Sequence, residues 1–257
     1  MIVLKFTLFL LKLECIMKYV EVVEKVKGLR WLSESQGKTL YDLVYKNKIQ
    51  NVLELGFFHG VSAMYIAAAL QEKQTGGLIT TIDKYNAKDL HPNIDDLSSH
   101  AGLSEFIKPV YAHDCYTWEL LRLIDSQPRP TFDFVFIDGA HLWKTDGFAF
   151  FLCDKLLSED GYLIFDDIGW CMAKNADPNS KEWTKKYSDE EQSTNQLSKV
   201  FELLVKEHPS YGEFRVEDGW AFARKIKSNT KSNVKESIKV KTVVLTQEML
   251  KKRLKNK

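Results

Sequence analysis

Acidic side chains follow the short apolar segments of this 257-residue chain. Five such segments each end in or beside a carboxylate, and a carboxylate at a buried strand end needs a hydroxyl, a backbone amide or a cation as its partner. The acids are Glu54, Asp83, Asp114, Asp138 and the pair Asp166 and Asp167. If the segments are neighbouring strands of one sheet, this pattern predicts a site for a cation or for ligand hydroxyl groups.

Two glycines four residues apart indicate a second site. Gly56 ends the apolar run 51–55, and Gly60 stands just before Ser62, where good helix-forming sequence begins. Glycine permits backbone angles and close approach that a side chain would block. A strand that leads through such a turn into a helix N-terminus is a place where ligands bind. Asp83 stands at the spacing at which a carboxylate holds the two hydroxyls of a ribose.

Strands that alternate with helices must position these residues. The apolar runs predict strands at 51–55, 78–83, 107–112, 132–138 and 161–167. Helical periodicity is found at 18–48 (with Ser33 as an N-cap inside it), 62–70, 93–103, 116–126, 144–157 and 192–208. The alternation indicates a parallel sheet, and ligands bind at the carboxyl ends of such strands.

Two further segments complete the expected fold. Residues 168–191 are polar and irregular, and a loop of this length is usually functional. Asp218-Gly219 predicts a two-residue hairpin turn between strands at 214–217 and 220–226. The expected fold is therefore α/β: a doubly wound, mostly parallel seven-stranded sheet of the Rossmann-like type that ends in an antiparallel hairpin.

One catalytic domain is expected at 18–226. With 44% hydrophobic residues, the chain is long enough for one sizeable core, and nothing in its middle resembles a linker. Residues 1–17 are expected to be an upstream extension, with Met17 as the true start. A targeting signal is the alternative, although three charged residues interrupt its apolar run. Residues 227–257 are expected to form a basic, disordered tail.

Charge and cysteine content limit the partners and the compartment. Residues 227–257 carry ten Lys and Arg against two acids, which leaves 26 basic and 33 acidic residues, a net charge of −7, in the rest of the chain. The domain therefore lacks the signature of a nucleic-acid-binding protein, and no membrane span is expected. The four cysteines have neither metal-site nor disulfide spacing, which favours the cytoplasm.

The segment from Glu54 to Ser62 resembles the glycine-rich cofactor loop of the class I S-adenosylmethionine-dependent methyltransferases. The resemblance extends from about Gly28 to Ile226. It implies that S-adenosylmethionine (SAM) contacts the loop. The ribose and the adenine of SAM would be held farther along the sheet. The residues implied are Glu54, Gly56, Phe57, Gly60 and Ser62 in the loop, Asp83 at the ribose, and Asp114 and Cys115 at the adenine.

Within that class, residues 136–141 and 157–167 are similar to the divalent-cation-dependent small-molecule O-methyltransferases, both the catechol type and the sugar-modifying type. Carboxylates are the hard oxygen ligands that Mg²⁺ prefers, and a bound cation lowers the pKa of a substrate hydroxyl. His141 stands where catechol-type enzymes carry a basic residue and is the candidate general base. The resemblance implies Asp138, Asp166 and Asp167 as metal ligands, with Asp138 also a catalytic residue.

The expected function is SAM-dependent methyl transfer to a hydroxyl of a small molecule, a sugar or other polyol-containing metabolite. Related enzymes are commonly dimers or larger, so a homo-oligomer is expected. Two alternatives stay open: a metal-independent methyltransferase of the same fold, and a non-catalytic binding module on that scaffold. A nicotinamide-dependent oxidoreductase is disfavoured because its fingerprint needs a glycine where Phe58 stands.

Overall fold

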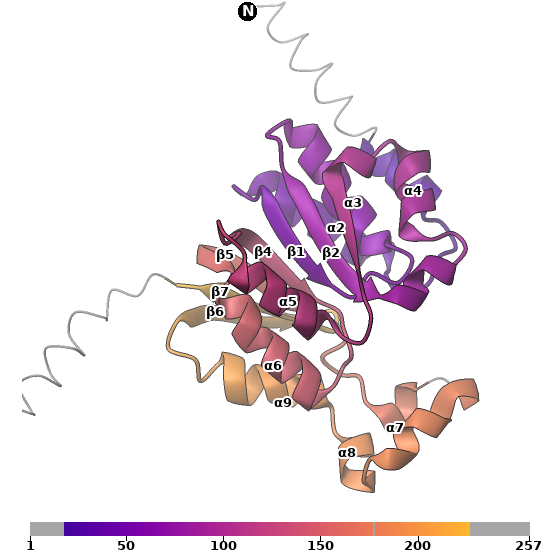
Figure 1. Cartoon of the computed structure of the whole chain (residues 1–257), viewed down its shortest axis with the longest axis vertical. Helices are drawn as coiled ribbons and strands as arrows, with labels where there is room; N and C mark the ends of the chain where they lie inside the picture. Colours follow the sequence, from indigo (N-terminus) through magenta and orange to yellow (C-terminus); the bar gives the residue numbers. More distant parts are fainter. Residues whose placement is uncertain (1–17, 177, 227–257) are drawn as a thin grey trace, which may run out of the picture. The chain divides into compact units, whose positions relative to one another are not determined.

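The computed structural model describes residues 18–176 and 178–226, and their course is shown in Figure 1. The chain up to Lys225 forms one compact unit, and a second unit begins at Ile226. The predicted upstream extension (1–17) and basic tail (227–257) lie outside the described residues.

A seven-stranded sheet forms the centre of the first unit. Its strands are β1 (Asn51–Leu55), β2 (Leu78–Lys84), β3 (Ile107–Ala112), β4 (Phe132–Ile137), β5 (Leu157–Phe165), β6 (Tyr211–Glu217) and β7 (Trp220–Lys225). They follow the order β3-β2-β1-β4-β5-β7-β6. The first five strands are parallel, whereas β7 runs antiparallel to both of its neighbours. The predicted fold class is confirmed.

Helices cover both faces of this sheet (Figure 1). One apolar core contains Val52 of β1 and side chains of α2 (Glu34–Lys46), α3 (Val61–Lys73) and α4 (Ile94–Ala101). The other contains Leu53 and side chains of α5 (Tyr116–Asp125), α6 (Trp143–Asp154) and α9 (Gln196–Val200). Adjacent β1 residues thus face opposite cores, as expected of a strand buried on both faces.

The remaining helical segments are short. They are residues 18–25, η1 (Tyr85–Asp89), η2 (Ser104–Phe106), α7 (Met172–Asn175), η3 (Pro178–Lys186), α8 (Asp189–Ser193) and the π-helical η4 (Phe201–Val205). Within 18–176 and 178–226, no helix is both long and apolar enough to cross a membrane.

Two local signals produce the predicted structure. The Ser33 hydroxyl accepts the N–H of Gln36 at 3.2 Å while the Gln36 side chain accepts the N–H of Ser33 at 3.0 Å, so a capping box begins α2. Asp218 and Gly219 have φ values of +50° and +82° and join β6 to β7. Both expectations, the N-cap and the hairpin, are confirmed.

Several boundary predictions are wrong, among them the start of β6, which is Tyr211 and not Phe214. β5 begins at Leu157, not Gly161, because Leu157 pairs with Phe132 of β4 before the register shifts. Residues 168–191 are not irregular but hold α7, η3 and the start of α8, which a Ser188 capping box initiates. The helix predicted from Gln192 begins only at Gln196, because the extended backbone of Thr194 separates it from α8.

Candidate functional site

The carboxyl ends of four strands place predicted site residues along one edge of the sheet. In the ladders that join β1 to β2 and β4, and β4 to β5, each strand's last paired residue is followed by a predicted site residue. These residues are Gly56 after β1, Asp83 in β2, Asp138 after β4 and Asp166 after β5. The ladder continues past the strands, since the Asp138 N–H donates to the Leu55 carbonyl at 2.8 Å. Ligands of open parallel sheets bind at this edge.

Asp83 holds the glycine turn in shape. Its Oδ2 accepts the N–H groups of Phe57 at 2.9 Å and Phe58 at 2.7 Å, and its Oδ1 accepts that of Lys84 at 2.6 Å. A carboxylate has about four lone-pair sites, so about one remains for a ligand hydroxyl.

Gly56 is required by the packing of two loops. Its φ is +87°, and a Cβ there would lie 1.8 Å from the carbonyl oxygen of Asp138. The turn after β1 and the loop after β4 are therefore in direct backbone contact, which only glycine allows. This contact explains the glycine without any ligand.

The start of α3 is open to a ligand. Gly60 is its N-cap, with a φ of +92° and no side-chain cap. The Ile94 side chain fills the space that a Cβ at Gly60 would need. First-turn N–H groups, which include that of Ser62, have no acceptor inside a helix, so an anionic group can bind there.

Glu54 lies fully buried two residues before the turn. The Thr81 hydroxyl donates to its Oε2 at 2.5 Å, and the Ser62 side chain is a second hydrogen-bond partner. Its Oε1 has no partner within the described part of the chain. Burial raises the pKa of Glu54 to about 8. A nearby cationic group would favour the charged form and lower that pKa.

We expect Glu54→Gln to stabilise the free protein at pH 8 more than at pH 5. Between its ordinary pKa of 4.5 and the folded value of about 8, Glu54 is protonated when folded and ionised when unfolded, so wild-type stability falls as pH rises. Glutamine removes this dependence. Melting curves at both pH values should show that the advantage of the variant in melting temperature is roughly 10 °C larger at pH 8; a constant difference would contradict the assignment.

Asp138, His141 and Asp167 form a cluster whose three ligand atoms lie within 4.8 Å of one another. Nε2 of His141 is 3.4 Å from Oδ1 of Asp138 and 3.7 Å from Oδ2 of Asp167. Both carboxylates are partly exposed, so an ion from solvent can reach them. Carboxylate oxygens suit Mg²⁺, and an added imidazole also suits transition metals.

Asp166 is nearly buried beside this cluster. The indole N–H of Trp220 and the N–H of Asp167 both donate to its Oδ1 at 2.5 Å. Burial and the charges of Asp138 and Asp167 raise the pKa of Asp166 to about 8. The structure thus groups two of the three predicted ligands with His141 and fixes the third by hydrogen bonds. Within the described ranges both bonds end on Oδ1, which leaves Oδ2 for a cation.

His141 is held among these acids in an unusual conformation. Its φ is +56°, and its ring packs against Trp170 with the centroids 5.1 Å apart. Burial alone would lower its pKa, but the hydrogen bond to Asp138 and the surrounding carboxylates outweigh burial and raise the pKa to about 9. In this state the imidazole is protonated at neutral pH and cannot accept a proton.

Asp114 and Cys115 lie farther along the edge, after β3. Asp114 is exposed, and Cys115 is the N-cap residue of α5 without a side-chain cap. No hydrogen bond among the described residues joins either of them to Asp83.

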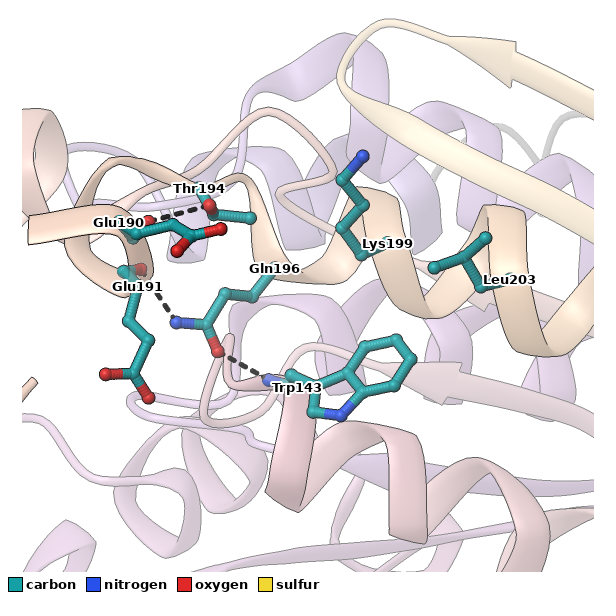
Figure 2. A pocket seen from close by; sticks show the side chains of 7 residues that line it. All are labelled: Trp143, Glu190, Glu191, Thr194, Gln196, Lys199 and Leu203. Atoms are coloured by element: carbon teal, nitrogen blue, oxygen red, sulfur yellow. Dashed lines mark hydrogen bonds between the residues drawn. The ribbon is translucent and has the colours of Figure 1, made fainter. Parts of the chain in front are cut away.

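Two hollows adjoin the segment 138–143. The smaller, about 30 Å³, lies between Arg30–Leu32 and the glycine turn, and Asp138 lines it. The larger, about 290 Å³, lies where the start of α6 meets α8 and α9 (Figure 2). Its lining residues are Trp143, Glu190, Glu191, Thr194, Gln196, Lys199 and Leu203.

Figure 2 shows that Gln196 connects the elements around the larger hollow. Its Oε1 accepts the N–H of Trp143 at 2.7 Å, and its Nε2 donates to the carbonyl of Glu191 at 2.9 Å. The segment that carries His141 is thereby tied to α8 and α9.

Tyr116 and Asp146 lie behind the loop 138–142 and are not among the site residues predicted from the sequence. Asp146 offered a signal, because it shares the buried side of α6 with apolar residues such as Ala149 and Phe150. An acid on the apolar side of a helix indicates a buried hydrogen-bond acceptor.

The strand order, the glycine turn and the acids at one sheet edge agree with the class I methyltransferase fold that the sequence resembles. Residues 53–168 match a family model described as a methyltransferase domain, over less than half of the chain. The matched segment runs from β1 past the end of β5, and the match confirms the resemblance seen in the sequence. No curated protein matches the chain.

Solved methyltransferases share the fold. The O-methyltransferase from Bacillus cereus, in complex with S-adenosylhomocysteine (SAH), is 20% identical, with a TM-score of 0.59 over 81% of this chain and 90% of that chain. SAM-bound TomG from Streptomyces achromogenes is 18% identical, with a TM-score of 0.57 over 83% of this chain and 90% of that chain. The SAH-bound methyltransferase PaMTH1 from Podospora anserina is 19% identical, with a TM-score of 0.59 over 82% of this chain and 88% of that chain. At such identities the likeness establishes the fold alone.

Proposed function

We propose that this protein is an O-methyltransferase that transfers the methyl group of SAM to a hydroxyl of a small molecule, a sugar or other polyol-containing metabolite, with the help of Mg²⁺. The observation that carries the proposal is the cluster of Asp138, His141 and Asp167 at the same sheet edge as the glycine turn. The SAM and SAH complexes of proteins with this fold support the cofactor.

The glycine turn fits the cofactor. SAM supplies a methyl group on a positively charged sulfur, and its methionine part also carries an ammonium and a carboxylate. We assign the positive charges to the side of Glu54, whose buried Oε1 has no hydrogen-bond partner among the described residues, and the carboxylate to the start of α3 at Gly60 and Ser62. Asp83 keeps about one lone-pair site for a ribose hydroxyl. Phe57 completes this cradle.

The acidic cluster fits a hard divalent cation. We assign Asp138, Asp167 and Oδ2 of Asp166 as its ligands. A bound Mg²⁺ polarises the acceptor hydroxyl and lowers its pKa. When the carboxylates share their charge with a cation, they attract the proton of His141 less strongly, so the pKa of His141 falls and the imidazole can take the hydroxyl proton.

Methyl transfer from labelled SAM to a panel of sugars, polyols and catechols tests the proposal. We expect turnover with Mg²⁺ and a loss of about 100-fold or more in EDTA, since metal catalysis is worth several kcal/mol. Equal turnover in EDTA would favour the metal-independent alternative. The binding module would be favoured by two results together. The protein would transfer methyl groups to no acceptor, and the double change Asp167→Ala and His141→Ala would leave its ligand affinity unchanged.

A further inference from the structure

The loop 138–142 is held from behind by a buried tyrosine–aspartate pair. The Tyr116 hydroxyl donates to Oδ1 of Asp146, and both side chains are buried. Each member also accepts a hydrogen bond from the loop. The N–H of Ala140 donates to the Tyr116 oxygen at 3.2 Å, and that of Leu142 donates to Oδ2 of Asp146 at 2.8 Å. The pair therefore contacts the loop backbone at two points.

His141 stands between these two anchored amides. Its left-handed backbone conformation, with a φ of +56°, is unfavourable for a residue with a side chain and persists only where the surroundings enforce it. Gly139 brings the loop directly against the pair, because a Cβ there would lie 2.5 Å from the Tyr116 oxygen. The anchors thus surround the strained residue on both sides.

We propose that Tyr116 and Asp146 are positioning residues, which fix the loop so that Asp138 and His141 face Asp167. Neither residue belongs to the three-ligand cluster, and both hold the backbone of the loop by hydrogen bonds. The inference rests on the proposed function for the role of the cluster. The anchoring itself rests only on the hydrogen bonds.

A second tyrosine–aspartate pair, in which only the tyrosine is buried, supplies a control. The Tyr211 hydroxyl donates to Oδ1 of Asp154 at 3.1 Å, at the opposite end of α6 from the loop. Tyr211 is buried like Tyr116. Loss of either hydroxyl removes a hydrogen bond of a buried tyrosine to an aspartate, but only the Tyr116 hydroxyl is also bonded to the loop.

The test compares Tyr116→Phe with Tyr211→Phe in the full chain, by amide hydrogen exchange of residues 139–143 and by Mn²⁺ affinity from electron paramagnetic resonance. For Tyr116→Phe we expect loop exchange to rise at least tenfold and Mn²⁺ affinity to fall by about tenfold, as is typical when a group that orients a metal ligand is lost. Tyr211→Phe should leave both unchanged. Asp146→Asn, which keeps an oxygen for the Leu142 N–H, should lie in between.

Loop exchange in Tyr116→Phe within twofold of wild type overturns the proposal, and so does faster exchange with unchanged Mn²⁺ affinity. If wild-type protein binds no Mn²⁺, the metal part of the proposed function fails, while hydrogen exchange still decides whether the pair holds the loop. If Tyr116→Phe does not fold, Asp146→Asn decides by the same two measurements.

Discussion

We expect Asp138→Asn to lower the rate of Mg²⁺-supported methyl transfer by about 10³-fold, because a metal-bound oxygen typically contributes several kcal/mol of transition-state stabilisation. Asparagine keeps the shape of the side chain but removes the negative charge that would bind the cation and that lies nearest to His141. The affinity for SAH should fall far less. Turnover at saturating SAM and calorimetry with SAH measure the two effects separately.

Asp133→Asn is the matched control on the same strand. Asp133 lies at the opposite end of β4, where its Oδ2 accepts the N–H groups of Gln50 at 2.9 Å and Asn51 at 3.0 Å. Asparagine can still accept these bonds, so near-normal turnover is expected. Wild-type turnover in Asp138→Asn, or an equal loss in both variants, would contradict the assigned role of Asp138.

Gly56→Ala should abolish SAH binding or prevent folding. A Cβ at this position would lie 1.8 Å from the Asp138 carbonyl oxygen, a distance that no side chain reaches without moving the backbone. The turn and the loop after β4 would have to separate, which disturbs the cofactor cradle and the acidic cluster together. Calorimetry with SAH and thermal unfolding are the measurements.

Gly76→Ala separates this clash from backbone strain. Gly76 also has a positive φ, +72°, but a Cβ there meets nothing within 4 Å. We expect it to cost about 1–2 kcal/mol of stability through the unfavourable φ alone, with normal SAH affinity. If the two variants bind SAH equally well, the contact between the loops has no bearing on the cofactor site.

The sheet and its functional edge are predictable from the sequence because their signals are local. Apolar runs that stop at a carboxylate locate the strand ends, and the two glycines locate the turn after β1. Asp218-Gly219 and Ser33 determine a turn and a helix start through contacts within three residues. Such features do not depend on the rest of the fold.

The division of roles among the acids is not predictable, because it depends on pairing between distant segments. Asp166 and Asp167 are adjacent in sequence, yet only Asp166 is held by the indole of Trp220, which lies 54 residues away. Tyr116 meets Asp146 across 30 residues. β5 likewise extends back to Leu157 only because Phe132 of β4 lies beside it. No local pattern contains these contacts.

A crystal structure of the protein with SAH and Mn²⁺ tests the central claim most directly, since the anomalous scattering of manganese locates the ion independently of the cofactor. We predict SAH in the turn 56–62 and one manganese peak about 2.1 Å from carboxylate oxygens of Asp138 and Asp167. SAH bound away from the turn, or bound there with no peak at these carboxylates, would contradict the account.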